Sequence, residues 1–394
     1  MNVLILSEKL WPEGSGGELA TYLYTRLLIE NDVNVKVAIS STPNYFEAWS
    51  ELPIYMIPVL GRGKYTIVPM FKKVRELFKW SDIVYCTDFF PTIPLIKQAF
   101  KKPVVVHIHS YFPTCPVGSL YNLKENSICK SNNRNCVNCI LYYEKSHRRS
   151  SKLALTSTLL NSTVGRHFLS FLKFADALIF VSRAQKTLFL KHAPNLFIPS
   201  YVIYNPLPKL SLAPINGDDL GYFGGLSPLK GFHILLKALL KTYHKRQVRI
   251  HATKMEHLAG LEPLREIEIV SYGRLYGSSY EGVYKRIRGV VLPSIYQEPL
   301  PYVAAEALLK GRLLVATRVG GVPEMAEGLK GALIVKPNDA DNLADALDQV
   351  LSMDRSEVVE LGLKNRKGIL KKFDNDRTVN ELIRVFERVT NSHE

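Results

Sequence analysis

The sequence contains no long hydrophobic run and no repetitive segment. No stretch of eighteen apolar residues occurs among the 394 residues, so the sequence predicts no membrane span. Residues 1–6 lack both a basic segment and a small-residue cleavage site, which favours a first buried strand over a secretory signal. The absence of internal repeats and low-complexity segments excludes solenoid and disordered architectures. We therefore expect a cytoplasmic globular protein, and its length favours two domains.

Acidic residues are scarce relative to basic ones, mainly in one part of the chain. The formal net charge is +15, and residues 51–200 hold 21 Lys and Arg against 7 Asp and Glu. Basic clusters lie at 71–79, 101–102 and 145–149. They fit either solvated helix faces or a peripheral contact with anionic lipid at the inner membrane face. No nucleic-acid-binding motif accompanies them, so we expect no nucleic-acid partner.

Short apolar segments alternate with amphipathic helical segments along the whole chain. This alternation predicts the α/β class, with parallel sheets covered by helices on both faces. A turn-rich stretch at 205–217 separates two such series. We expect two Rossmann-like, doubly wound domains that face each other across a cleft. The first covers 1–205, with a cysteine-rich insertion at about 111–150, and the second covers 206–374.

The same alternation predicts individual elements. In the first domain we expect strands at 3–6, 33–38, 54–58, 83–85, 104–107, 177–181 and 201–203, and helices at 18–30, 69–80, 94–100, 152–174 and 183–192. In the second we expect strands at 220–223, 248–252, 267–270, 290–292 and 313–316, and helices at 231–243, 301–310, 340–353 and 355–372, with a further helix where 317–324 turns. Residues 375–389 have the spacing of a terminal helix.

Two glutamates eight positions apart, Glu298 and Glu306, flank the expected start of a helix. Pro299 and Pro301 keep the backbone extended after Glu298, and Pro301 suits the first position of the helix. Unpaired N–H groups at a helix start attract an anion such as a diphosphate. Carboxylates beside them can accept hydrogen bonds from sugar hydroxyls. This arrangement is what a nucleotide-sugar site requires.

The segment that contains these glutamates resembles the signature of the retaining GT-B glycosyltransferases of family four. In residues 293–337 the pair is followed by a buried strand and by a Gly-Gly-Val-Pro-Glu turn at 320–324, which is similar to that family's turn. The resemblance implies transfer of a sugar from a UDP-, GDP- or ADP-sugar to a glycan, lipid-linked or other hydroxyl acceptor. It also implies that catalysis requires no cofactor, and that a terminal helix over 375–394 crosses back to the first domain.

The resemblance implies roles for residues of the second domain. Glu298 would contact the donor sugar and Glu306 the ribose, and Lys230 in the Gly-rich turn 220–231 matches a lysine that contacts the diphosphate. Gly225 stands where the family has an arginine, so diphosphate binding depends more on Lys230. Further donor-binding candidates are Leu300, Pro301 and Tyr302 around the helix start, and Arg274.

In the first domain, His109 matches the family's histidine near the transferred sugar, which makes it a catalytic candidate together with Glu298. Ser110 replaces the acid that usually follows, so the pKa of His109 is not expected to be raised. Gly16 and Gly17 lie in the Gly-rich loop that resembles the family's loop near the diphosphate and acceptor.

Four of the five cysteines fall in the insertion, as Cys115, Cys129, Cys136 and Cys139. A C-x13-C-x6-C-x2-C pattern suits a structural zinc site, but disulfides or free thiols fit it as well. A reducing cytoplasm favours the metal.

Two other functions compete with sugar transfer. A nucleotide-sugar epimerase can share the fold, although the glutamate spacing and glycine loops favour transfer. A non-catalytic nucleotide-sugar-binding protein on a degenerate scaffold is suggested by Gly225 and Ser110. Such a protein would bind donor without turnover.

Overall fold

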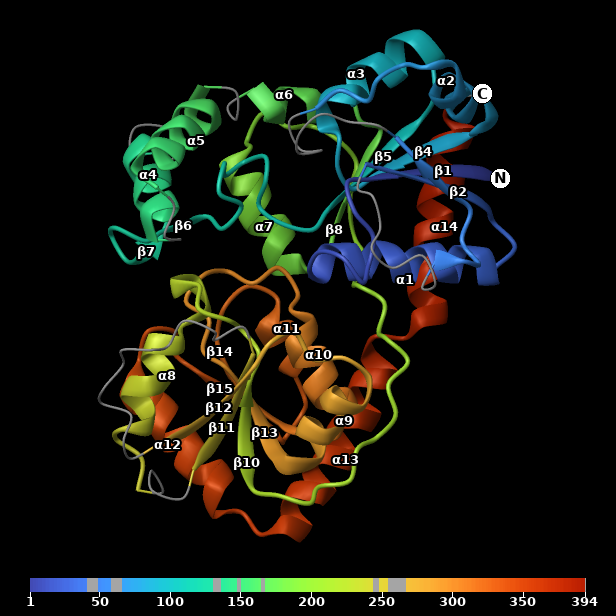
Figure 1. Cartoon of the computed structure of the whole chain (residues 1–394). Helices are drawn as coiled ribbons and strands as arrows, with labels where there is room; N and C mark the ends of the chain where they lie inside the picture. The colour runs from blue at the N-terminus through green and yellow to red at the C-terminus, as the bar shows by residue number, and fades with distance from the viewer. Residues whose placement is uncertain are drawn as a thin grey trace. The chain divides into compact units, whose positions relative to one another are not determined.

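The computed structural model describes residues 1–40, 49–57, 66–129, 136–146, 150–163, 167–243, 248–253 and 267–393. The chain divides into two units. Met1–Leu207 and Phe373–Glu394 form the first, and Pro208–Lys372 form the second (Figure 1).

A seven-stranded sheet forms the centre of the first unit, in the order β3-β2-β1-β4-β5-β8-β9. Every neighbouring pair is parallel, and β1 and β4 are buried along nearly their whole length. Such continuous burial is typical of parallel strands with both faces covered. The strands are β1 (Asn2–Ser7), β2 (Asn34–Ile39), β3 (Ile54–Met56), β4 (Ile83–Cys86), β5 (Val104–Ile108), β8 (Ala177–Phe180) and β9 (Ser200–Val202).

The last helix of the chain belongs to this first unit. Helix α14 (Asn375–Asn391) lies beside α1 (Gly16–Glu30), as the red and blue helices of Figure 1 show. Its Phe386 ring lies 5.4 Å from the ring of Tyr85 in the central sheet. The other helices outside the insertion are α2 (Lys72–Trp80), α3 (Ile93–Leu95), α6 (Phe168–Leu172) and α7 (Arg183–His192).

The cysteine-rich insertion contains a small hairpin and two helices. Strands β6 (Tyr121–Asn122) and β7 (Ser127–Ile128) pair antiparallel, and α4 (Cys136–Ser146) packs against α5 (Ser151–Thr163). Where one helix was predicted over 152–174, the structure has α5 up to Thr163 and α6 (Phe168–Leu172), and residues 164–166 of that prediction lie outside the described residues.

The second unit has a six-stranded parallel sheet in the order β12-β11-β10-β13-β14-β15. Figure 1 shows α8 and α12 on one face of this sheet and α9, α10 and α13 on the other. The strands are β10 (Asp219–Tyr222), β11 (Arg249–Thr253), β12 (Glu268–Tyr272), β13 (Ile287–Leu292), β14 (Leu313–Thr317) and β15 (Ala332–Val335). The helices are α8 (Phe232–Leu239), α9 (Gly277–Arg286), α10 (Tyr302–Leu309), α11 (Val322–Ala326), α12 (Ala340–Ser352) and α13 (Arg355–Lys372).

The structure adds α9 and β15 to the predicted elements and starts β13 earlier than predicted, at Ile287. This longer strand accommodates a buried arginine. Arg288 Nη1 donates to the carbonyls of Val350, Leu351 and Met353 at the end of α12, and Nη2 lies 2.6 Å from Asp218. These partners satisfy a buried charge that a sequence pattern cannot foresee.

The predicted fold class, with two doubly wound parallel-sheet domains, is confirmed. Among the described residues, no helix combines the length and the apolar composition of a membrane span.

Candidate active site

The Gly-rich turn after β10 places Lys230 beside the end of β13. Tyr222 donates a 2.7 Å hydrogen bond to the carbonyl of Gly225, which adopts a left-handed φ of 69°. At Gly231, with φ of 71°, a Cβ atom would lie 1.8 Å from the carbonyl oxygen of Pro293. Only glycine permits this close approach, so the turn is fixed against the β13 loop.

Backbone hydrogen bonds to two other loops fix the loop after β13. On one side, the amide of Ile295 donates to the carbonyl of Leu229 at 2.9 Å. On the other, Gly321 N donates to the carbonyl of Glu298 at 2.8 Å, and a Cβ at Gly320 would lie 1.8 Å from that oxygen. The glycine pair of the predicted Gly-Gly-Val-Pro-Glu turn therefore packs directly on the backbone of Glu298.

These two loops bring Lys230 and Glu298 into contact. Lys230 Nζ lies 2.6 Å from Glu298 Oε1, and the Glu298 side chain is only 4% exposed. Ser294 Oγ donates to the same carboxylate oxygen at 2.7 Å, and Tyr296 Oη donates to Oε2 at 2.7 Å. A buried carboxylate with two hydroxyl donors and a cation is electrostatically satisfied. Ser294 and Tyr296 were not predicted, although both lie within the segment that carries the resemblance.

Glu306 lies on α10, partly buried, and contacts a residue of α9. Tyr280 Oη donates to Glu306 Oε2 at 3.0 Å. Burial raises the pKa of Glu306 to about 7, and the Tyr280 hydrogen bond and the Lys310 charge oppose this rise. Glu306 therefore changes charge close to neutral pH. Tyr280 was missed because the pattern did not predict α9.

The start of α10 differs slightly from the expectation. Pro301 is the N-cap, with φ −79° and ψ 123°, and the helix begins at Tyr302. Pro301 was expected at the first helical position, one residue further into the helix. Leu300 and Tyr302 are 7% and 8% exposed, so this helix start lies in a largely buried environment.

Arg274 lies apart from the other candidates. It is exposed, and its guanidinium carbon lies 5.3 Å from the ring centroid of Tyr276. Within the described ranges, no hydrogen bond or ion pair connects it with Lys230, Glu298 or Glu306. Its assignment to the base or phosphate stays a prediction.

In the first unit, Gly16 and Gly17 open helix α1 behind the N-cap Ser15. Glu18 Oε2 accepts hydrogen bonds from Ser15 N at 2.6 Å and from Ser15 Oγ at 2.9 Å. These two bonds cap the N-terminus of the helix. A Cβ at Gly17 would lie 3.2 Å from the Cβ of His109, so the glycine lets this helix approach the end of β5.

His109 follows β5 and stacks on His107, with ring centroids 4.3 Å apart. Its two ring nitrogens are buried without a hydrogen-bond partner in the described structure. Burial lowers the pKa of His109 to about 4, against an opposing charge from Glu18. The imidazole is therefore neutral at physiological pH. His107 is a buried strand residue whose Nδ1 lies 2.5 Å from Tyr85 Oη.

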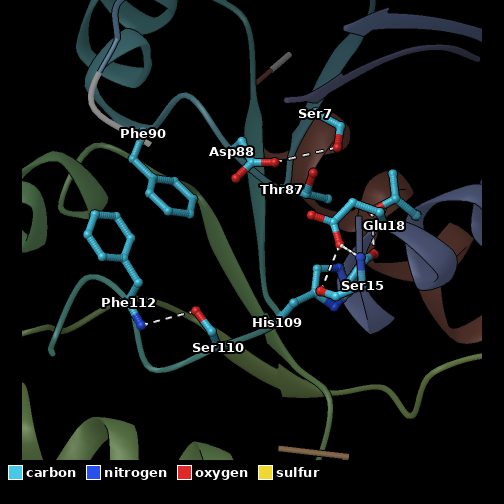
Figure 2. A pocket seen from close by; sticks show the side chains of 11 residues that line it. Ser7, Ser15, Glu18, Thr87, Asp88, Phe90, His109, Ser110 and Phe112 are labelled. Carbon is cyan, nitrogen blue, oxygen red and sulfur yellow. Dashed lines mark hydrogen bonds between the residues drawn. The ribbon is translucent and has the colours of Figure 1, made fainter. Parts of the chain in front are cut away.

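Figure 2 shows the pocket around His109, a cavity of about 120 Å³. Ser110 Oγ lies on its wall and accepts from the amide of Phe112 at 3.2 Å. Asp88 adds a carboxylate, and its Oδ2 accepts from Glu8 N at 3.0 Å. The sequence reading missed Asp88, although its position just after the central strand β4 is where open α/β sheets bind ligands.

Each unit therefore brings some of the predicted site residues together. The second unit joins Lys230 directly to Glu298, whereas Glu306 has its own partner, Tyr280. The first unit brings Gly17 against His109. The four cysteines of the insertion line one separate cavity.

Solved structures with this architecture align with almost the whole chain. HepE of Anabaena, solved in complex with UDP-glucose, has a TM-score of 0.68 at 18% identity, with 98% of this chain and 100% of that chain covered. Sucrose-phosphate synthase from Thermosynechococcus elongatus has a TM-score of 0.70 at 16% identity, with 99% of each chain covered. At these identities the likeness establishes the fold, which is that of the GT-B glycosyltransferases.

A family model also matches part of the sequence. Residues 217–353 match the model described as glycosyl transferases group 1. An uncharacterized glycosyltransferase of Methanocaldococcus jannaschii is 26% identical over 180 residues, which cover 42% of this chain and 44% of that protein. A D-inositol 3-phosphate glycosyltransferase of Corynebacterium urealyticum is 32% identical over 160 residues, covering 37% of each. The matches span less than half of these relatives.

Proposed function

We propose that the protein transfers a sugar from a nucleotide-diphosphate sugar to a hydroxyl acceptor, with retention at the anomeric carbon. The observation that carries this proposal is the contact of Lys230 with the buried carboxylate of Glu298, beside the start of α10. A cation next to a helix N-terminus suits a diphosphate, and the adjacent carboxylate suits sugar hydroxyls. Glu306, further along α10, would accept hydrogen bonds from the ribose.

The reaction needs no redox partner. The bond between the anomeric carbon and the diphosphate oxygen breaks, and the acceptor oxygen forms a bond to that carbon on the same face. The acceptor's proton passes to the leaving diphosphate. Lys230 and the amides near Leu300, Pro301 and Tyr302 would stabilise the charge that develops on that diphosphate.

Gly16, Gly17 and His109 would position the reacting sugar and the acceptor. A neutral imidazole with unpaired ring nitrogens can donate one hydrogen bond and accept another. Because burial lowers the pKa of His109 to about 4, this residue would act as a polar contact rather than as a cation. Arg274 would contact the base or a phosphate.

The acceptor we propose is a glycan or a lipid-linked or phosphorylated molecule. The basic residues Lys72, Lys73 and Lys79 are exposed on α2, while Val74, Leu77 and Phe78 of the same helix are buried. This face would hold the protein at an anionic membrane surface, where a lipid-linked acceptor is found.

The experiment that tests this function is sugar release to water as a surrogate acceptor. UDP-glucose is the first donor to try, since HepE was solved with it, followed by GDP- and ADP-sugars. Proton NMR would identify the anomer of the sugar that is released first. Release of the donor's own anomer supports retaining transfer, and the opposite anomer contradicts retention. Donor binding without any release, including in the presence of glycan and lipid-linked acceptors, would contradict transfer.

A further inference from the structure

The four cysteines of the insertion converge from separate segments of the chain. Cys115 lies in the loop after β5, Cys129 follows β7, and Cys136 and Cys139 lie on the first turn of α4. All four line one cavity of about 70 Å³, together with Tyr121 and neighbouring residues. No disulfide joins the described cysteines.

The four thiols also lie near one another. Cys139 interacts electrostatically with Cys115, Cys129 and Cys136. Like-charged thiolates that share a cavity need a cation to balance their charge.

The two helices of the insertion bury few apolar side chains. Ile140 and Glu144 are the buried residues of α4, and Leu153, Leu155 and Leu159 of α5 are 64%, 64% and 65% exposed. The hairpin has strands of two residues each. Elements with so little packing of their own are commonly stabilised by a disulfide or a metal.

We propose that Cys115, Cys129, Cys136 and Cys139 bind one thiophilic divalent cation, Zn²⁺, which stabilises the insertion. Binding replaces four S–H bonds by four Zn–S bonds and releases four protons. Among the described residues, no group of three or more His, Cys, Asp or Glu is already placed to hold a metal. Loading must therefore bring the four sulfur atoms closer together around the cavity that they line.

The test is metal binding by the whole reduced protein. The metal content of protein purified without chelator is measured first, and Co²⁺ is then titrated into metal-free protein. We expect one Zn²⁺ per chain and, with Co²⁺, the thiolate-to-metal charge-transfer band and intense visible bands of a tetrahedral sulfur site. No binding with all thiols titratable would overturn the proposal, and so would a disulfide between two of the four cysteines.

Variants show whether these residues are the ligands. Cys136→Ser and Cys139→Ser should each weaken binding by about tenfold or more, as loss of a ligand or its support does. Cys86→Ala is the matched control, because Cys86 lies in β4 and not at this cavity, and it should bind like the wild type. Circular dichroism checks that each variant is folded. Equal binding by all three variants would overturn the assignment.

Discussion

Lys230 Nζ lies 2.6 Å from Glu298 Oε1, although 68 positions separate the two residues in the sequence. Adjacent parallel strands produce this contact, because β10 and β13 pair and their following loops emerge at the same edge of the sheet. In the proposed function, this pair joins a cation that binds the diphosphate to a carboxylate that binds the sugar hydroxyls, within one unit. Each of the two charges is needed to keep the other satisfied.

Removal of this cation should weaken donor binding. Lys230→Ala should raise the dissociation constant of the nucleotide sugar at least tenfold, about 1.4 kcal/mol, because the diphosphate loses its contact. Isothermal titration calorimetry measures this change. Lys237→Ala, an exposed lysine on α8, is the control and should bind normally. Equal affinities for the two variants would show that Lys230 does not contact the donor.

The raised pKa of Glu306 should appear in the pH dependence of stability. Between about pH 4.5 and about pH 7 the folded state keeps a proton that the unfolded state has lost, so stability falls as pH rises through this window. Glu306→Gln, neutral at every pH, should match the wild type near pH 4.5 and exceed it at pH 8 by roughly 1–2 kcal/mol, since solvent screens a partly exposed carboxylate.

Urea unfolding at the two pH values measures this difference for Glu306. A Glu306→Gln effect of the same size at pH 4.5 and pH 8 would mean that the carboxyl group titrates normally in the folded protein.

The pKa of His109, lowered to about 4, leads to a prediction about the protonation of its ring. The folded state resists protonation, so the ring should stay neutral down to about pH 5, where an unperturbed imidazole is already charged. The ring C–H resonances of His109, identified by their loss in His109→Asn, should therefore show no shift between pH 8 and pH 5.5. A midpoint between pH 6 and pH 7 would show that the ring is solvated.

The basic face of α2 should bind anionic vesicles. Replacing Lys72, Lys73 and Lys79 by Gln should lower the binding constant for phosphatidylserine vesicles, measured by cosedimentation at low salt, by about a hundredfold, at about 1 kcal/mol per lysine near the surface. The matched control replaces Lys364, Lys367 and Lys371, which are exposed on α13, and should leave binding unchanged. If neither triple variant changes vesicle binding, the proposed contact of α2 with an anionic membrane is wrong.

Much of the fold could be predicted from local pattern. The strands that form both sheet centres read as apolar runs, because both of their faces are buried. The predictions failed where long-range partners decide the structure. Arg288 extends β13 because the carbonyls at the end of α12 accept its hydrogen bonds.

Prediction of the candidate site also failed where residues far apart in the sequence become neighbours. Lys230 and Glu298 could be selected because both lie in motifs, and the structure joins them. Tyr280, the partner of Glu306, and Asp88 in the first unit belong to no motif and are placed only by the fold. The spacing of residues in a motif predicts which side chains act at the site. It does not predict which neighbouring side chains shift their pKa values.

The most direct test of the proposed donor site is a thermal-shift measurement with UDP-, GDP- and ADP-sugars. We compare the wild type with Glu306→Ala, and Lys237→Ala serves as the control. We expect a rise in melting temperature with one class of nucleotide sugar, retained by Lys237→Ala and lost by Glu306→Ala. Unchanged melting temperatures with all three donors, or an equal rise in Glu306→Ala, would contradict a nucleotide-sugar site at Glu306.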